Sequence, residues 1–268
     1  MLTEALTFVF FLLIGLEIRE GIKRPKEAVL PALCALFGML LPALIFITLQ
    51  RGTSAWAVAM PTDVALAIGA LSILGKRVNP SVRIFLLTLA VADDFFSLIV
   101  IAIFFHKDLH LASAIYTLGA AAIGFLLPFR STLVKVLAPI VTFVIIPIYI
   151  WINLLWHLDF SQSTSKISLV LVSARVVGKV LGISLSAWLL TKWTPLALPP
   201  TLNLKEVIGV GFLAGMGLTV SIVMAKITLA TSNELSEVRV GLFFAALLSG
   251  ALGLLWLRFT GVTGERGN

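Results

Sequence analysis

Residues 81–105 read SVRIFLLTLAVADDFFSLIVIAIFF, an apolar run in which Asp93 and Asp94 occupy the thirteenth and fourteenth positions. An α-helix rises 1.5 Å per residue, so this run can cross a hydrocarbon core of about 30 Å, with the aspartates near its middle. A charge at that depth costs about 2.5–3.5 kcal/mol, and such residues usually mark a functional site. The stretch therefore predicts a membrane helix that carries a buried polar site.

The whole chain has the composition of a membrane protein. Of its 268 residues, 59% are hydrophobic and 12% are charged, whereas soluble domains have about 25% charged residues. The mean hydropathy is +1.08. The net charge of +7 does not indicate nucleic-acid binding, because the basic residues fall in short loops between apolar runs. We expect no cofactor, and the single cysteine, Cys34, excludes an intrachain disulfide.

The apolar runs predict an all-α, polytopic membrane protein with a single transmembrane domain over residues 1–268. The runs are too long and continuous for the alternating strands of a membrane barrel. The first run has no basic region before it and no cleavage site after it, so we expect a retained helix and not a signal peptide. Nine spanning helices are expected, at about 3–18, 28–49, 56–74, 81–105, 111–128, 134–156, 167–190, 206–229 and 237–257.

The basic residues predict the orientation. Thirteen would face one side of the membrane and three the other, so the positive-inside rule puts the N-terminus outside and the C-terminus in the cytoplasm. The first group comprises Arg19, Lys23, Arg24, Lys26, Lys76, Arg77, Arg83, Arg130, Lys135, Lys192, Lys205, Arg258 and Arg266, and the second Arg51, Lys107 and Lys166.

The adjacent carboxylates predict exchange of a cation for a proton. Two like charges a few ångströms apart in a low dielectric titrate as a unit and share a proton. Carboxylate oxygens also suit hard cations such as Na⁺ or Li⁺. Lys179, at the thirteenth position of the run 167–190, is the expected counter-ion or proton carrier. Arg175 lies one helical turn earlier and is expected to have a structural pairing role.

Two of the runs contain residues that interrupt a helix. Pro61-Thr62-Asp63 falls inside 56–74, with Gly69 beyond it. The run 206–229 contains Gly209, Gly211, Gly215 and Gly217, followed by Thr219 and Ser221. Spaced glycines alone more often mean close helix packing, so the pattern depends on the two interruptions taken together.

The interrupted runs are the middle members of two three-helix sets, 28–105 and 167–257. The sets would cross the membrane in opposite directions. Interrupted segments at matching positions of two halves predict inverted repeats with discontinuous crossing helices. We expect these repeats to form the core, with 1–27 and 106–166 as a reduced panel region beside it.

Five strings, in order along most of the chain, resemble the NhaA-type Na⁺/H⁺ antiporters: FFLLIGLE (10–17), TDVALAIG (62–69), ADD (92–94), GKVLGIS (178–184) and GMGLTVSI (215–222). The resemblance implies that Asp94 is the principal cation-binding carboxylate and that Asp93 pairs with Lys179, with Na⁺ held by the two aspartates. It implies that Thr62 and Asp63 lie in one helix break, where the carboxylate offsets half-helix dipoles. Gly215 and Gly217 correspond to the other break, and Glu17 is a candidate for pH sensing.

The chain also departs from that family. It begins at what resembles the family's second helix, so the first helix and the dimer-contact hairpin would be missing and we expect weak or absent homodimerisation. Leu111–Phe129 looks like a fusion that omits about two middle helices. Arg130–Pro139 has no acid or histidine where the family has a cluster linked to pH sensing, and Phe96 and Val180 replace a glycine and a proline.

The sequence thus predicts a secondary antiporter of a bacterial inner membrane that exchanges Na⁺ or Li⁺ for protons, and not an enzyme. The main alternative is a shortened, non-transporting remnant that serves as a scaffold or regulator, and another cation or an organic substrate is also open. An intramembrane aspartic protease is disfavoured, because adjacent aspartates point about 100° apart. We expect solvated side chains and not metal ligands at His106, His110 and His157.

Overall fold

The computed structural model describes residues 2–21, 25–75, 78–105, 115–127, 130–229 and 231–260, and these residues form helices and no strands. Three of the helical segments, η3, η4 and η7, are π-helical, while η1, η5 and η6 are 3₁₀ turns. The elements are α1 (Leu2–Gly21), α2 (Pro25–Leu49), η1 (Ser54–Ala59), α3 (Val64–Ile73), α4 (Pro80–Phe104), η3 (Ile115–Gly119), α6 (Ala120–Leu126), α7 (Arg130–Ile140), η4 (Val141–Ile145), α8 (Ile146–Asn153), η5 (Leu155–His157), η6 (Phe160–Thr164), α9 (Lys166–Ser173), η7 (Ala174–Gly178), α10 (Lys179–Trp193), α11 (Leu204–Ala214), α12 (Thr219–Thr228) and α13 (Ser232–Thr260).

Six helical stretches within the described ranges are long and apolar enough to cross a membrane. A seventh is the bent pair of α11 and α12, whose axes differ by 49°. The expected number of nine is not confirmed. Two of the nine expected helices do not meet this criterion. Helix α1 carries four charged residues, and the described apolar helix in the run 111–128 covers only Tyr116–Leu126. The chain is therefore a multi-pass helical membrane protein. The six stretches are Ala28–Leu49, Ser54–Ile73, Pro80–Phe104, Leu133–His157, Lys166–Trp193 and Ser232–Thr260.

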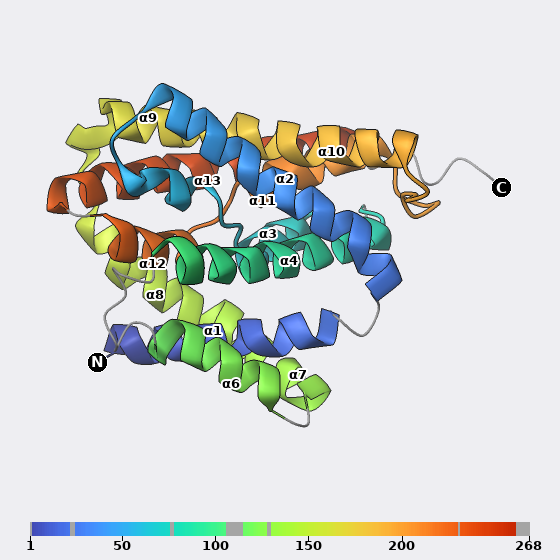
Figure 1. The fold of residues 1–268 in the computed structure, drawn as a ribbon, viewed down its shortest axis with the longest axis horizontal. Helices are drawn as coiled ribbons and strands as arrows, with labels where there is room; N and C mark the ends of the chain where they lie inside the picture. The colour runs from blue at the N-terminus through green and yellow to red at the C-terminus, as the bar shows by residue number, and fades with distance from the viewer. Residues whose placement is uncertain are drawn as a thin grey trace.

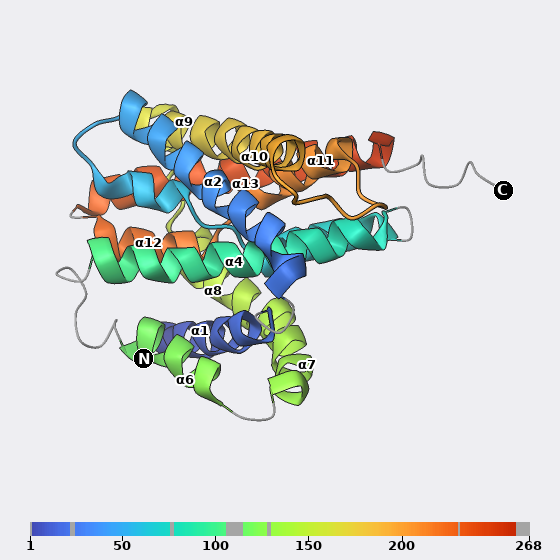
Figure 2. The same ribbon diagram turned by 45° about the vertical axis from the view of Figure 1, so that its right-hand side comes forward.

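The helices form two groups that lie side by side (Figures 1 and 2). One contains α1, α6 and α7, and the other contains α2, α3, α4 and the helices from α9 to α13, with α8 between them. Helices α1 and α6 approach backbone to backbone, because a Cβ on Gly15 would lie 2.0 Å from the Ala121 carbonyl oxygen and one on Gly124 would lie 2.1 Å from that of Leu12. The division into a core and a reduced panel region remains a prediction.

Helices α2 and α10 pack tightly through small residues, as membrane helices commonly do. A Cβ on Gly178 would lie 2.8 Å from Pro42 Cα, and a Cβ on Gly182 would lie 2.5 Å from the Phe37 carbonyl oxygen. Helix α4 packs against both α2 and α11. These contacts hold the middle of α4 and the start of α10, which carry the charged residues, inside the larger group of helices.

Both interrupted runs are broken, as the sequence predicts. Helix is absent from Met60 to Asp63, between η1 and α3, and from Gly215 to Leu218, between α11 and α12. Proline at position 61 lacks the N–H that a helix needs there. Gly69 is not part of a break, because it lies inside α3 with no atom within 4 Å of a Cβ placed on it. The breaks position the polar groups described next.

Candidate functional site

The two helix breaks are in direct contact. A Cβ built on Gly217 would lie 2.2 Å from the Pro61 carbonyl oxygen and 2.2 Å from Nη2 of Arg175, so no larger residue fits without a shift. Gly215 is similarly confined, with a Cβ lying 2.2 Å from Ser249 Oγ. The structure thus brings together Pro61 and Gly217, which are far apart in the sequence, and leaves unwound backbone inside the protein, where its polar groups need partners.

The carboxylate of Asp63 accepts hydrogen bonds from the N-terminal ends of α3 and α12, the half-helices that follow the two breaks. Its Oδ1 accepts a hydrogen bond from the Leu66 N–H at 3.3 Å, which caps α3. Its Oδ2 accepts from the N–H and the hydroxyl of Thr219, the first residue of α12, at 3.2 and 2.7 Å. Because the start of a helix carries partial positive charge, this carboxylate is favourably placed at both ends. It is 1% exposed.

Arg175 has the complementary position at the C-terminal ends of the first half-helices. Its guanidinium donates to the carbonyl oxygens of Val58 in the last turn of η1 and of Pro61 after it, at 2.8 and 2.6 Å, and to that of Gly215 after α11, at 3.2 Å. A fourth bond goes to Ser221 Oγ at 2.7 Å. The side chain is fully buried. Helix C-terminal ends carry partial negative charge, so a fixed cation stabilises them.

Lys179 links the first break to the aspartate pair. Its Nζ lies 3.3 Å from each carboxylate oxygen of Asp93 and donates to Thr62 Oγ1 at 2.9 Å. The Thr62 N–H also donates to Asp93 Oδ2. Charge-assisted contacts are usually 2.7–2.9 Å long, so the Lys179–Asp93 contact is a loose one. The predicted pairing of these two residues is therefore present in the geometry.

Asp94 is the least compensated carboxylate of the site. It is 3% exposed, and its Oδ1 is buried without a hydrogen-bond partner among the described residues. Glu17 lies on α1 and is only half-buried.

The buried charges at the crossing do not balance. Asp63, Asp93 and Asp94 are three acids, and Arg175 and Lys179 are two bases, all at most 3% exposed. With every group ionised, one negative charge remains, and Oδ1 of Asp94 is the carboxylate oxygen among them that has no hydrogen-bond partner in the described residues. An isolated buried charge is costly, so the site favours one added positive charge.

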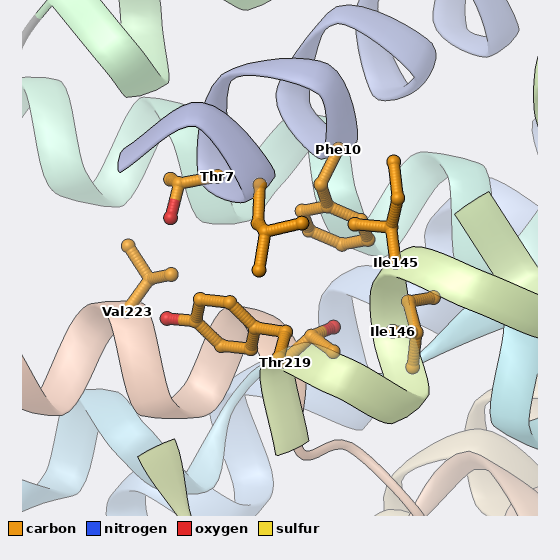
Figure 3. Close-up of a pocket in the computed structure, with 8 residues that line it drawn as sticks. Thr7, Phe10, Ile145, Ile146, Thr219 and Val223 are labelled. Carbon is orange, nitrogen blue, oxygen red and sulfur yellow. The ribbon is translucent and has the colours of Figure 1, made fainter. Parts of the chain in front are cut away.

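A small cavity borders this arrangement (Figure 3). It has a volume of about 10 Å³, space for one water molecule. Thr7 and Phe10 reach it from α1, and Thr219 and Val223 reach it from α12. Neither Asp93 nor Asp94 lines the cavity. It lies instead beside Thr219, which donates hydrogen bonds to Asp63.

Two partners in the site are not foreseen from the sequence. Thr219 and Ser221 stand out only as polar residues after the glycines, and nothing in their spacing indicates Asp63 and Arg175 as their partners. The expected pairing role of Arg175 is directed at backbone carbonyls and a hydroxyl, not at an acid. The sequence does indicate that Arg175 is buried, because it lies four residues before Lys179 on the same face of a predicted membrane helix. His157 is exposed, and His106 and His110 lie outside the described residues.

Comparison with known proteins gives a consistent relationship over almost the whole chain. The family model described as Na⁺/H⁺ antiporter 1 matches residues 1–136 and 128–257. The Na⁺/H⁺ antiporter NhaA 1 of Klebsiella pneumoniae is 30% identical, with 96% of this chain and 81% of the relative covered. The Na⁺/H⁺ antiporters NhaA of Salmonella arizonae and Citrobacter koseri are each 28% identical, with 96% of this chain and 82% of each relative covered.

The alignments also bear on the length of the chain. Each extends over 319 residues, more than the 268 of this protein, so parts of the relatives inside the alignment have no counterpart here. The two family-model matches meet at residues 128–136, just after the stretch where the omission of helices is expected. The family consists of membrane transporters and not of enzymes. On the combined extent of these matches, the chain belongs to the Na⁺/H⁺ antiporter 1 family.

Proposed function

We propose that the chain exchanges Na⁺ or Li⁺ for protons across a bacterial inner membrane through Asp93 and Asp94. The observation that carries this proposal is the charge imbalance at the helix crossing, where three buried acids face two buried bases. One proton or one monovalent cation restores neutrality, and the two cannot occupy the same carboxylate oxygens together. Competition of this kind is the requirement for antiport.

Each site residue has a role in this proposal. Asp94 binds the cation or the proton, because its Oδ1 has no protein partner. Asp93 joins in cation binding when its loose contact with Lys179 opens, and Lys179 acts as counter-ion or proton carrier. Thr62 orients Asp93, whereas Asp63 offsets the half-helix dipoles. Gly215 and Gly217 let the breaks meet. Glu17 is the proposed pH-sensing group on the panel side.

The proposal includes the membrane architecture. We propose nine crossings, with α1 and the helix near residues 111–128 added to the stretches that meet the apolar criterion, and two inverted three-helix repeats over 28–105 and 167–257. The supporting observation is that both repeats contain a broken middle member and that the breaks touch. In Figure 1, α1 begins and α13 ends at opposite ends of the bundle, as an odd number of crossings requires.

The test is exchange activity in everted membrane vesicles, followed by dye quenching with a series of cations. Asp94→Asn keeps the size of the side chain and removes its charge, so it should abolish Na⁺- and Li⁺-driven proton movement while the protein still inserts. The exposed Asp159 is a matched control outside the spans. Hydrogen bonds from Ser161 lower the pKa of Asp159, so it is ionised near neutral pH.

The control variant Asp159→Asn should transport like wild type. Normal transport by Asp94→Asn would show that the site is wrong. No transport by the wild-type chain with any cation would favour the alternative of a non-transporting scaffold or regulator, which the length difference from the relatives suggests.

A further inference from the structure

A second buried oxygen near Asp94 lacks a hydrogen-bond partner. Ser97 lies on α4, three residues after Asp94, and is 1% exposed. Its hydroxyl oxygen and Oδ1 of Asp94 are both enclosed and unpartnered among the described residues. Leaving a buried polar group unpaired is unfavourable. These two atoms belong to residues one helical turn apart on α4.

The Ser97 hydroxyl does not bond to its own helix, unlike several other helical hydroxyls of this protein. Helical Ser and Thr residues commonly donate back to the carbonyl four residues earlier. Thr88 on the same helix does so, with its hydroxyl 2.9 Å from the Ile84 oxygen, and Ser72 and Ser186 behave likewise. Ser97 makes no such bond. The other unpartnered buried hydroxyls belong to Ser168, Ser184, Thr228 and Ser249, none of which is on α4.

Helix geometry directs Ser97 between the two aspartates. At about 100° per residue, the direction of Ser97 is about 40° from that of Asp93 and about 60° from that of Asp94. Its Cα lies about 4.5 Å further along the axis than that of Asp94. Side chains of a helix tilt toward its N-terminus, so the Ser97 side chain leans back toward the carboxylates. The three groups thus face the same region.

The carboxylate oxygens of the other two buried aspartates are already engaged. Both oxygens of Asp93 contact Lys179, and one also accepts from the Thr62 N–H. Both oxygens of Asp63 accept hydrogen bonds from the half-helix ends. On α4, the buried side-chain oxygens without a hydrogen-bond partner are therefore those of Asp94 and Ser97.

We infer that Ser97 supplies a neutral oxygen ligand to the Na⁺ or Li⁺ ion held at Asp94. The inference rests on the proposed function and adds a residue to its cation site. A hydroxyl oxygen suits a hard cation, yet it does not hold the transported proton, which resides on a carboxylate. Ser97 therefore strengthens cation binding without strengthening proton binding, and it shifts the competition between the two toward the cation.

Substitution of Ser97 separates these two effects. Ser97→Ala should raise the apparent KM for Na⁺ and for Li⁺ by about tenfold, the size of one lost contact with a charged group, with a maximal rate within about twofold of wild type. Ser97→Thr keeps the hydroxyl and should restore most of the affinity. Ser97→Cys keeps the size but offers soft sulfur, so it should resemble Ser97→Ala. Thr88→Val removes a hydroxyl that bonds its own helix and should leave both KM values unchanged.

The measurements are vesicle antiport over a range of Na⁺ and Li⁺ concentrations and the rise in melting temperature that each cation gives the purified variants. The melting shift at a fixed cation concentration should shrink in Ser97→Ala and Ser97→Cys. Wild-type KM values and melting shifts in both variants would overturn the inference. With Asp94→Asn inactive at the same time, only the role of Ser97 is lost, whereas an active Asp94→Asn would remove the proposed function itself.

Discussion

Asp93 and Lys179 form the only salt bridge seen between fully buried side chains in the described residues, and each depends on the other. Asp93→Asn should leave the lysine as an unpaired buried cation. Breaking one side of a buried pair typically costs about 3–5 kcal/mol, and less if the lysine loses its proton. We therefore expect Asp93→Asn to lower thermal stability in detergent more than Asp94→Asn does, since Oδ1 of Asp94 has no protein partner to lose.

A double-mutant cycle measures that dependence. Adding Lys179→Ala to Asp93→Asn should recover part of the lost stability, because the unpaired cation disappears. Purely additive losses would argue against the pairing and leave the ion site untouched. Antiport assayed on the same variants separates loss of function from loss of fold.

The residues of the site differ in how well the sequence reveals them. Charged side chains inside long apolar runs are conspicuous, so Asp93, Asp94 and Lys179 can be identified from position alone. The environment of Arg175 cannot be identified from the sequence, because its partners are mainly backbone carbonyls, which every residue has. The unpaired state of the Ser97 hydroxyl likewise depends on its rotamer and its neighbours, and residue type does not encode either.

Among the elements, the helix breaks follow most directly from residue type. Proline removes a backbone donor and glycine permits close approach, so both interruptions were predictable. Their contact was not, since no local pattern states which distant segment a break will meet. The π-helical segment η4 is a further departure from an expected uniform helix, and it lies between Pro139 and Pro147, whose missing N–H groups disturb regular bonding on either side.

Two glycines in the broken runs give opposite expectations. Gly217→Ala would place a Cβ 2.2 Å from the Pro61 oxygen and from the Arg175 guanidinium, so it should separate the breaks, lower the melting temperature and reduce antiport. Gly69→Ala has open space inside α3 and should be neutral or stabilise by up to about 1 kcal/mol. Melting curves of both variants beside wild type test this, and an unaffected Gly217→Ala would mean that the breaks do not touch.

At the scale of the whole molecule, the charge bias makes a prediction about sidedness. In a background with Cys34 replaced by alanine, a cysteine at position 24 should react with an impermeant maleimide only from the cytoplasmic side. One at position 162, in the polar connection between η5 and α9, should react only from outside. Modification of both positions from one side would contradict the proposed topology.

The crossing of the breaks also sets an order of events during synthesis. Pro61 and Asp63 find their partners 114 and 156 residues later in the chain. At about 5–20 residues per second, a ribosome needs roughly 8–30 s to make the longer stretch. During that interval the first break exists without Thr219, and for most of it without Arg175, so its polar groups depend on water or on the insertion machinery. A segment made late in synthesis thus completes one that is made early.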